Sequence, residues 1–419
     1  MPLTTITRTW PLLFGMGVLM LGAGLQGTLL GVRATLEAFP TAVTGIVMAC
    51  YYVGYLFGTI AAPRLIHGVG HVRVFAALAA VASAATLIQA AFVHPISWGA
   101  MRLVTGLCFA GIYVVAESWL NGFATQTNRS RLLAVYMVVL YVGLGAGQFL
   151  LLLSNPESSV PFMLVSGLIS LAMVPTLLSA QLTPAVVVPR AVRFRELYRL
   201  SPLGVMAVMV AGLISSIIFS IGPVYARLEG LDTSAIATFM AVSILAGVAT
   251  QYPVGMLADR WERRAVIAGA CALATVAAWS IVAFSGMPRA LFLALSAVFS
   301  GSALTIYSLG TSHVNDRLEP AQMVAASSAL LLLNGAAAVL GPVLASALMT
   351  QFGPSGYFAT LGTLSGVLTL HCLWRKSRRG PVPQAQRGPY ISAQPQPCAS
   401  VGEPPWLQPQ ADGPTENRN

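Results

Sequence analysis

Residues 255–264 read Gly255-Met-Leu-Ala-Asp259-Arg260-Trp-Glu-Arg263-Arg264 and join two apolar segments, 235–257 and 265–285. Each segment is about twenty residues long, which is the length that crosses a bilayer as a helix. A related stretch, Pro63-Arg-Leu-Ile-His67-Gly-Val-Gly70-His-Val-Arg73, stands 192 residues earlier between apolar segments 41–62 and 73–93. The sequence therefore predicts membrane helices that are joined by short charged loops and arranged as an internal repeat.

The composition of the whole chain agrees with a membrane protein. Of its 419 residues, 56% are hydrophobic and 9% are charged, whereas soluble domains carry about 25% charged residues. This balance excludes a soluble globular enzyme, a disordered protein and a disulfide scaffold. The only lysine, Lys376, follows no glycine-rich run, so the sequence predicts no phosphate-binding loop of an ATPase. The five cysteines have no metal-ligand spacing, and we expect no cofactor.

The expected fold class is an all-α integral membrane protein with twelve transmembrane helices in two six-helix pseudo-repeats. The expected domains are an N-terminal six-helix bundle (1–179), a cytoplasmic linker (180–202), a C-terminal six-helix bundle (203–376) and a disordered, proline-rich cytoplasmic tail (377–419). The twelve apolar segments are 11–32, 41–62, 73–93, 97–120, 132–153, 161–180, 203–226, 235–257, 265–285, 289–312, 322–349 and 355–374. The first segment is too long for a cleaved signal sequence, so we interpret it as a retained helix.

The positive charges define the topology. If the N-terminus is inside, 19 of the 23 basic residues lie on the cytoplasmic side, and only Arg33, Arg227 and Arg289 lie outside. The positive-inside rule then places both termini in the cytoplasm. The net charge of +10 is thereby explained without nucleic acid as a partner. We expect a multi-pass protein of the inner (plasma) membrane.

The loop at 255–264 resembles the signature loop of the major facilitator superfamily, which follows the second helix in that family and recurs more weakly after the eighth. Here the second copy matches better, because His67 and Gly68 replace the acidic and basic residues in the first copy. Two further stretches resemble the YcaD-like branch. They are Arg102-Leu-Val-Thr-Gly106 and Asn128-Arg129-Ser-Arg131. The resemblance implies a transporter that works by alternating access.

The charged residues of the cytoplasmic loops are candidates for gating. The resemblance implies that such residues clamp neighbouring helices in one state, and topology determination alone is the alternative. The candidates are Asp259, Arg260, Arg263, Arg264, Arg129 and Arg131.

Two ionisable residues, Arg102 and Glu117, lie within the fourth apolar segment, where a charge is costly and usually functional. They are fifteen residues apart, or about 22 Å along a helix, so they do not pair. Arg102 could anchor an anion or take part in proton coupling, or it could extend to the outer surface. Glu117 could carry a proton, or it could form a salt bridge to Arg129 or Arg131.

The expected substrate cavity is mostly apolar, with neutral polar and aromatic groups. Each of these groups could also hold neighbouring helices together. The candidates are Gln26, Tyr52, Tyr113, Gln148, Tyr307 and Asn334.

We expect a secondary active transporter of a small solute that works as a monomer in the lipid bilayer and is coupled to protons. A multidrug-type efflux transporter is one alternative. A membrane receptor or scaffold that acts through its proline-rich tail is another.

Overall fold

The computed structural model describes residues 3–123, 129–179, 194–284, 286–318, 320–378 and 390. Within this part of the chain, twelve helical runs are long and apolar enough to cross a membrane, as the sequence predicted. The expected tail, 377–419, lies outside the described residues except for positions 377, 378 and 390.

The elements follow one another through short connections. The first group comprises α1 (Leu3–Leu36), α2 (Thr41–Val69), α3 (His71–Ala91), α4 (Pro95–Phe123), α5 (Arg129–Gly147), the 3-10 helix η1 (Gln148–Leu153) and α6 (Val160–Ser179). The second comprises α7 (Phe194–Leu200), α8 (Pro202–Leu228), α9 (Thr233–Arg260), α10 (Arg263–Ala283), α11 (Arg289–Leu304), α12 (Ile306–Asn315), α13 (Pro320–Phe352) and α14 (Gly356–Arg378).

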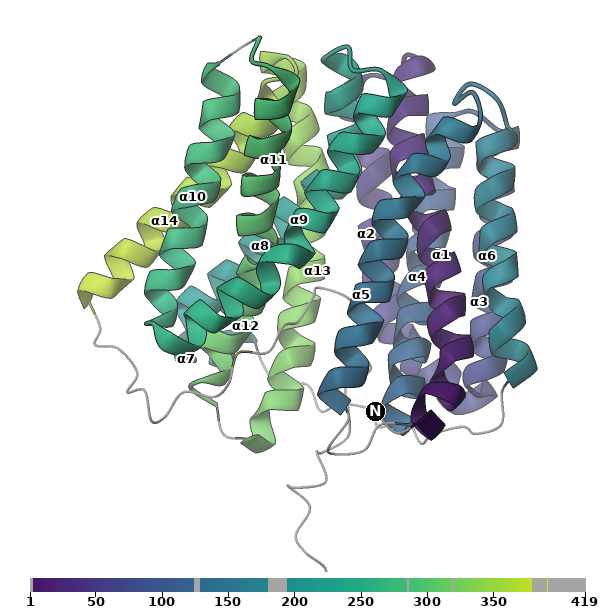
Figure 1. Cartoon of the computed structure of the whole chain (residues 1–419), viewed down its shortest axis with the longest axis horizontal. Helices are drawn as coiled ribbons and strands as arrows, with labels where there is room; N and C mark the ends of the chain where they lie inside the picture. Colours follow the sequence, from purple (N-terminus) through teal and green to yellow (C-terminus); the bar gives the residue numbers. More distant parts are fainter. Residues whose placement is uncertain are drawn as a thin grey trace, which may run out of the picture.

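Figure 1 shows α1–α6 on one side of the molecule and α8–α14 on the other. Across the middle, α1 packs against α8, α2 against α13 and α5 against α9. Between apolar helices in lipid, small residues allow this close approach. Gly54 of α2 lies against the carbonyl of Leu103, and Gly106 of α4 lies against the carbonyl of Tyr51. These reciprocal contacts fix α2 and α4 together beside Arg102.

Two spans are interrupted. The fifth continues from α5 into η1 at Gln148, and the tenth is divided at Thr305 into α11 and α12. The Thr305 hydroxyl donates to the carbonyl of Ser302 at 2.7 Å, a bond within the preceding turn. Such local bonds compete with the regular helical pattern and accompany bends.

The internal repeat is visible in the contacts at the cytoplasmic side. Arg263, the first residue of α10, forms an ion pair with Asp316 at 3.0 Å, directly after α12. At the corresponding place in the first group, His71 Nε2 lies 2.8 Å from the hydroxyl of Ser118 on α4. Both contacts join the start of one span to the inner end of the following span. The first group therefore uses a neutral pair where the second uses a charged one.

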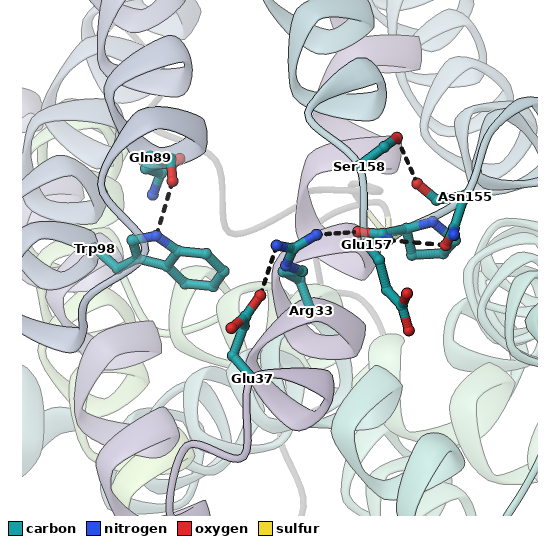
Figure 2. Close-up of polar contacts among 8 residues, drawn as sticks. Arg33, Glu37, Gln89, Trp98, Asn155, Glu157 and Ser158 are labelled. Atoms are coloured by element: carbon teal, nitrogen blue, oxygen red, sulfur yellow. Dashed lines mark hydrogen bonds and ion pairs between the residues drawn. The ribbon is translucent and has the colours of Figure 1, made fainter.

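The outer end of the first group is held by polar contacts (Figure 2). Arg33 pairs with Glu37 at 2.5 Å and donates to the carbonyl of Pro156 at 3.1 Å, which ties the end of α1 to the loop before α6. Trp98 donates through Nε1 to the carbonyl of Gln89 at 2.9 Å and so fixes the start of α4 against the end of α3. Arg102 follows Trp98 by one helical turn on α4, so the bond of Trp98 also helps to position Arg102.

Candidate functional site

A cavity of about 180 Å³ lies near the middle of the spans, between the two groups of helices. Its wall is formed by α1, α2, α4, α5 and η1 of the first group and by α8, α9 and α13 of the second. Tyrosines and apolar residues make up most of the lining. Arg102 is the only ionisable Arg, Lys, His, Asp or Glu among the described lining residues.

Arg102 is 6% exposed and faces the cavity from α4. Its guanidinium carbon lies 4.3 Å from the centre of the Tyr51 ring, which is a cation–π contact. No carboxylate of the described residues forms an ion pair with Arg102, and Nε has no hydrogen-bond partner among those residues. A buried cation without an anionic partner is costly. The cavity therefore presents a positive charge that a negatively charged group would stabilise.

A cluster of aromatic rings surrounds this charge. Tyr51 lies 5.3 Å from Tyr52 and 6.0 Å from Tyr55 between ring centres, and Tyr55 lies 6.4 Å from Tyr113. The Tyr113 hydroxyl contacts the sulfur of Met20 at 3.3 Å. The hydroxyl of Tyr52 accepts from Ser220 at 3.2 Å, across the boundary between the two groups of helices. The rings offer an apolar surface beside a cation, and this combination suits an amphipathic anion.

The three amide side chains line the cavity but are bonded to neighbouring helices. Gln26 donates to Thr86 at 3.0 Å and to Gln89 at 3.3 Å. Gln148 donates to the carbonyls of Gly24 and Leu144 at 3.1 and 3.0 Å and accepts from Thr28. Asn334 donates to the carbonyl of Val208 at 2.9 Å. These bonds show that the amides join helices, as the alternative interpretation of the sequence allowed.

The cavity lining does not include every predicted residue. Tyr307 is buried on α12, outside the lining, and Glu117 is 2% exposed near the inner end of α4. Six predicted residues do line it: Arg102, Gln26, Tyr52, Tyr113, Gln148 and Asn334. Their part in substrate binding stays a prediction, as does proton transfer by Glu117.

The predicted gating residues occupy different surroundings. Asp259 and Arg260 are exposed at the end of α9, whereas Arg263 and Arg264 are buried. Arg264 lies 3.4 Å from the carboxylate of Glu262. Arg131 is exposed at the start of α5. The side chain of Arg129 lies outside the described residues, and the gating role of all six residues stays a prediction.

The two groups of helices meet on the outer side of the cavity. A Cβ atom on Gly31 of α1 would lie 2.9 Å from Cβ of Pro223 on α8. A Cβ atom on Gly45 of α2 would lie 2.5 Å from Cβ of Ser346 on α13. All four residues are near the outer ends of their helices. These contacts bring the two groups of helices together on the outer side of the cavity.

The prediction omitted several residues of the lining. Thr28, Ser215 and Ser220 contribute hydroxyl groups, and Phe219 contributes a ring. Serine and threonine are common in membrane helices, where they bond to their own backbone, so sequence alone gives no signal that separates these positions.

A bundle of twelve membrane helices around a central cavity, with charged loops on the cytoplasmic side, defines a multi-pass membrane transporter. Residues 12–308 and 234–410 match the Major Facilitator Superfamily, and the chain belongs to this family of transporters, which are not enzymes. Its homology to bacterial members places it in the cell membrane.

Two curated relatives cover nearly the whole chain. An uncharacterized MFS-type transporter of Enterobacter sp. (strain 638) is 30% identical over 378 residues, which are 89% of this chain and 97% of the relative. The uncharacterized MFS-type transporter YcaD of Escherichia coli O7:K1 is 29% identical over 386 residues, which are 91% of this chain and 100% of the relative. The predicted resemblance to the YcaD-like branch is confirmed.

Two solved structures share the fold. The nucleoside transporter NupG superposes with a TM-score of 0.76 at 12% identity, covering 89% of this chain and 100% of that chain. A bacterial homolog of the human lysosomal transporter Spinster, in an inward-facing and occupied conformation, gives a TM-score of 0.71 at 15% identity, covering 91% of this chain and 98% of that chain. At these low sequence identities, the likeness shows a shared fold and nothing about the solute.

Proposed function

We propose that this protein is a secondary active transporter that moves a small solute with one negative charge by alternating access, coupled to protons. The proposed transporting unit is the monomer, because one chain supplies the described lining of the cavity. The observation that carries the proposal is Arg102, a buried cation that faces the cavity and has no carboxylate partner among the described residues. A bound carboxylate would supply the missing counter-charge and accept hydrogen bonds from the guanidinium.

The size and lining of the cavity narrow the class of solute. A volume of about 180 Å³ has room for roughly twelve or more water molecules, since about 10–15 Å³ of such volume holds one. The tyrosines beside Arg102 suit an aromatic or aliphatic body. A single cation among the described lining residues favours a monoanion over a polyvalent anion. We therefore assign the solute to the small amphipathic monocarboxylates.

Proton coupling rests on two features of α4. Arg102 resembles the fourth-helix arginine that the superfamily links to proton transfer. Glu117 places a carboxylate at 2% exposure on the same helix.

The test is transport by the purified chain in proteoliposomes. A panel of small aromatic and aliphatic monocarboxylates is compared with the matching neutral amides, with and without a pH gradient. We expect flux of at least one acid, no flux of its amide, and stimulation by the gradient. If no acid is transported, or if acid and amide move equally well, the proposal is wrong.

Variants of Arg102 test the assigned residue. Removing one partner of a buried, hydrogen-bonded charge pair costs about 2 kcal/mol or more, so Arg102→Gln should weaken acid binding at least 30-fold. Arg102→Lys keeps the charge but loses the planar hydrogen-bonding face, so it should retain part of the affinity. Arg289→Gln is the control, because Arg289 is 55% exposed at the outer surface. An unchanged affinity in Arg102→Gln would overturn the assignment.

A further inference from the structure

One face of α9 carries a narrow slot at its cytoplasmic end. Gln251, Gly255 and Asp259 follow one another at intervals of four residues and therefore share that face. Gly255 provides the space between the other two. A Cβ atom at this position would lie 2.6 Å from Cδ1 and 2.9 Å from Cε1 of the Tyr390 ring. The ring of Tyr390 therefore occupies the space that only glycine leaves open.

Tyr390 belongs to the C-terminal tail (377–419) and is anchored at both ends of this slot. Its backbone N–H donates to Oδ1 of Asp259 at 2.8 Å, and its hydroxyl donates to Oε1 of Gln251 at 2.8 Å. The hydroxyl of Ser308 on α12 donates to the same oxygen of Gln251 at 3.2 Å. The ring also packs against the edge of the hydrophobic core. Burial raises the pKa of Tyr390 to about 12, so its hydroxyl keeps the proton that it donates.

The slot lies on the inner continuation of the cavity wall. Met240 and Ile244 of α9 line the cavity. Gln251 and Gly255 follow them by eleven residues each, and eleven residues make about three helical turns. All four positions therefore fall on nearly the same face of α9. A side chain in the slot stands between the cavity and the cytoplasm on that face.

We propose that Gln251, Gly255, Asp259 and Ser308 form a docking site for Tyr390 of the chain's own tail, and that the docked tyrosine obstructs the cytoplasmic approach to the cavity. The docking is independent of the transported solute. Its effect on transport rests on the function proposed above. Asp259 thereby gains a partner in the tail in addition to its place in the signature loop.

The test measures access to the cavity from the cytoplasm and needs no substrate. In a chain whose five native cysteines are replaced by serine, Ala23→Cys places a thiol in the cavity wall on α1. A charged, membrane-impermeant maleimide is added to inside-out vesicles, and the labelling rate is recorded. Tyr390→Ala should raise this rate more than about fivefold, because it loses the packing of the ring as well as one hydrogen bond of ordinary strength.

Three further variants make the result specific. Tyr390→Phe loses only the bond to Gln251, so its labelling rate should lie between those of the parent and Tyr390→Ala. Gly255→Ala leaves the tail intact but overlaps the ring, so it should also raise the rate. Tyr252→Ala is the matched control, because Tyr252 adjoins Gln251 on α9 but is 75% exposed. It should leave the rate unchanged.

The proposal is overturned if Tyr390→Ala labels at the parent rate, or if Tyr252→Ala accelerates labelling as much as Tyr390→Ala does. A failure of the transport experiment would not affect this reading, because labelling reports access alone. Conversely, if the protein transports a monocarboxylate but Tyr390→Ala labels at the parent rate, the docking proposal is wrong and the proposed function still stands.

Discussion

At the residue scale, the position of Arg102 depends on two glycines that carry no chemistry of their own. Gly54 lies against the backbone of Leu103, and Gly106 lies against the backbone of Tyr51. Leu103 adjoins Arg102 in the chain, and Tyr51 stacks on its guanidinium at 4.3 Å. The close approach of α2 and α4 therefore holds the cation and its aromatic neighbour in register.

Alanine at Gly54 should disturb this arrangement. Its Cβ atom would overlap the carbonyl oxygen of Leu103, so the two helices must separate. Overpacking of this kind costs about 1–3 kcal/mol. We expect a lower melting temperature in detergent and weaker solute binding. Gly68→Ala is the control on the same helix, because Gly68 has no atom within 4 Å of an added Cβ. Equal melting temperatures of the two variants would contradict the packing argument.

At the element scale, the ion pair between Arg263 and Asp316 joins the start of α10 to the end of α12. Nε of Arg263 lies 3.0 Å from Oδ2 of Asp316, and each side chain is 3% exposed. Breaking a buried pair by removing one partner leaves an uncompensated charge and costs about 3–5 kcal/mol. Asp316→Ala should therefore lower the stability of the folded chain substantially.

The double variant Arg263→Met/Asp316→Leu distinguishes the charge from the packing. Removing both charges avoids the uncompensated one, so the double variant should recover most of the melting temperature that Asp316→Ala loses. Asp232→Ala is the exposed control, since the Arg289–Asp232 pair spans 3.8 Å with side chains 55% and 68% exposed. It should change the stability by less than about 1 kcal/mol. A double variant as unstable as Asp316→Ala would refute this interpretation.

The spans could be predicted from sequence because each needs only a run of apolar residues of the right length. The breaks at Gln148 and Thr305 could not, since the conformation at Gln148 involves a bond to the carbonyl of Gly24 on another helix. Arg102 could be predicted as a cavity residue because a charge in lipid must face inward. Tyr307 lies outside the lining, and its part in substrate binding stays a prediction.

The contact of Tyr390 with α9 could not be predicted from the sequence, for a different reason. The proline-rich composition of the tail predicts a lack of packed core, and it carries no information about a single side chain that docks elsewhere. Gly255 and Asp259 belong to the stretch that resembles the signature loop, and that resemblance does not predict the ring of Tyr390 between Asp259 and Gln251.

At the scale of the whole molecule, contacts between the two groups of helices join them on the outer side of the cavity. Gly45 of α2 is central to these contacts, because its missing side chain leaves space for Ser346 and for the carbonyl of Pro342 on α13. An added Cβ atom would lie 2.7 Å from that carbonyl oxygen. Alternating access requires these contacts to separate when the outer side opens.

Gly45→Val should therefore shift the population toward states that open outward. The valine side chain cannot fit between α2 and α13 when they are closed, but it is tolerated when they are apart. A bias of about 1–3 kcal/mol corresponds to a change of about 5- to 150-fold in the equilibrium. With the thiol of Ala23→Cys as reporter, labelling by an impermeant reagent should become faster from the outside and slower from the cytoplasm. Gly167→Val is the control, because Gly167 on α6 has no atom within 4 Å of an added Cβ. If Gly45→Val folds normally and both labelling rates stay at the parent values, the outer contacts do not set the balance between the two states.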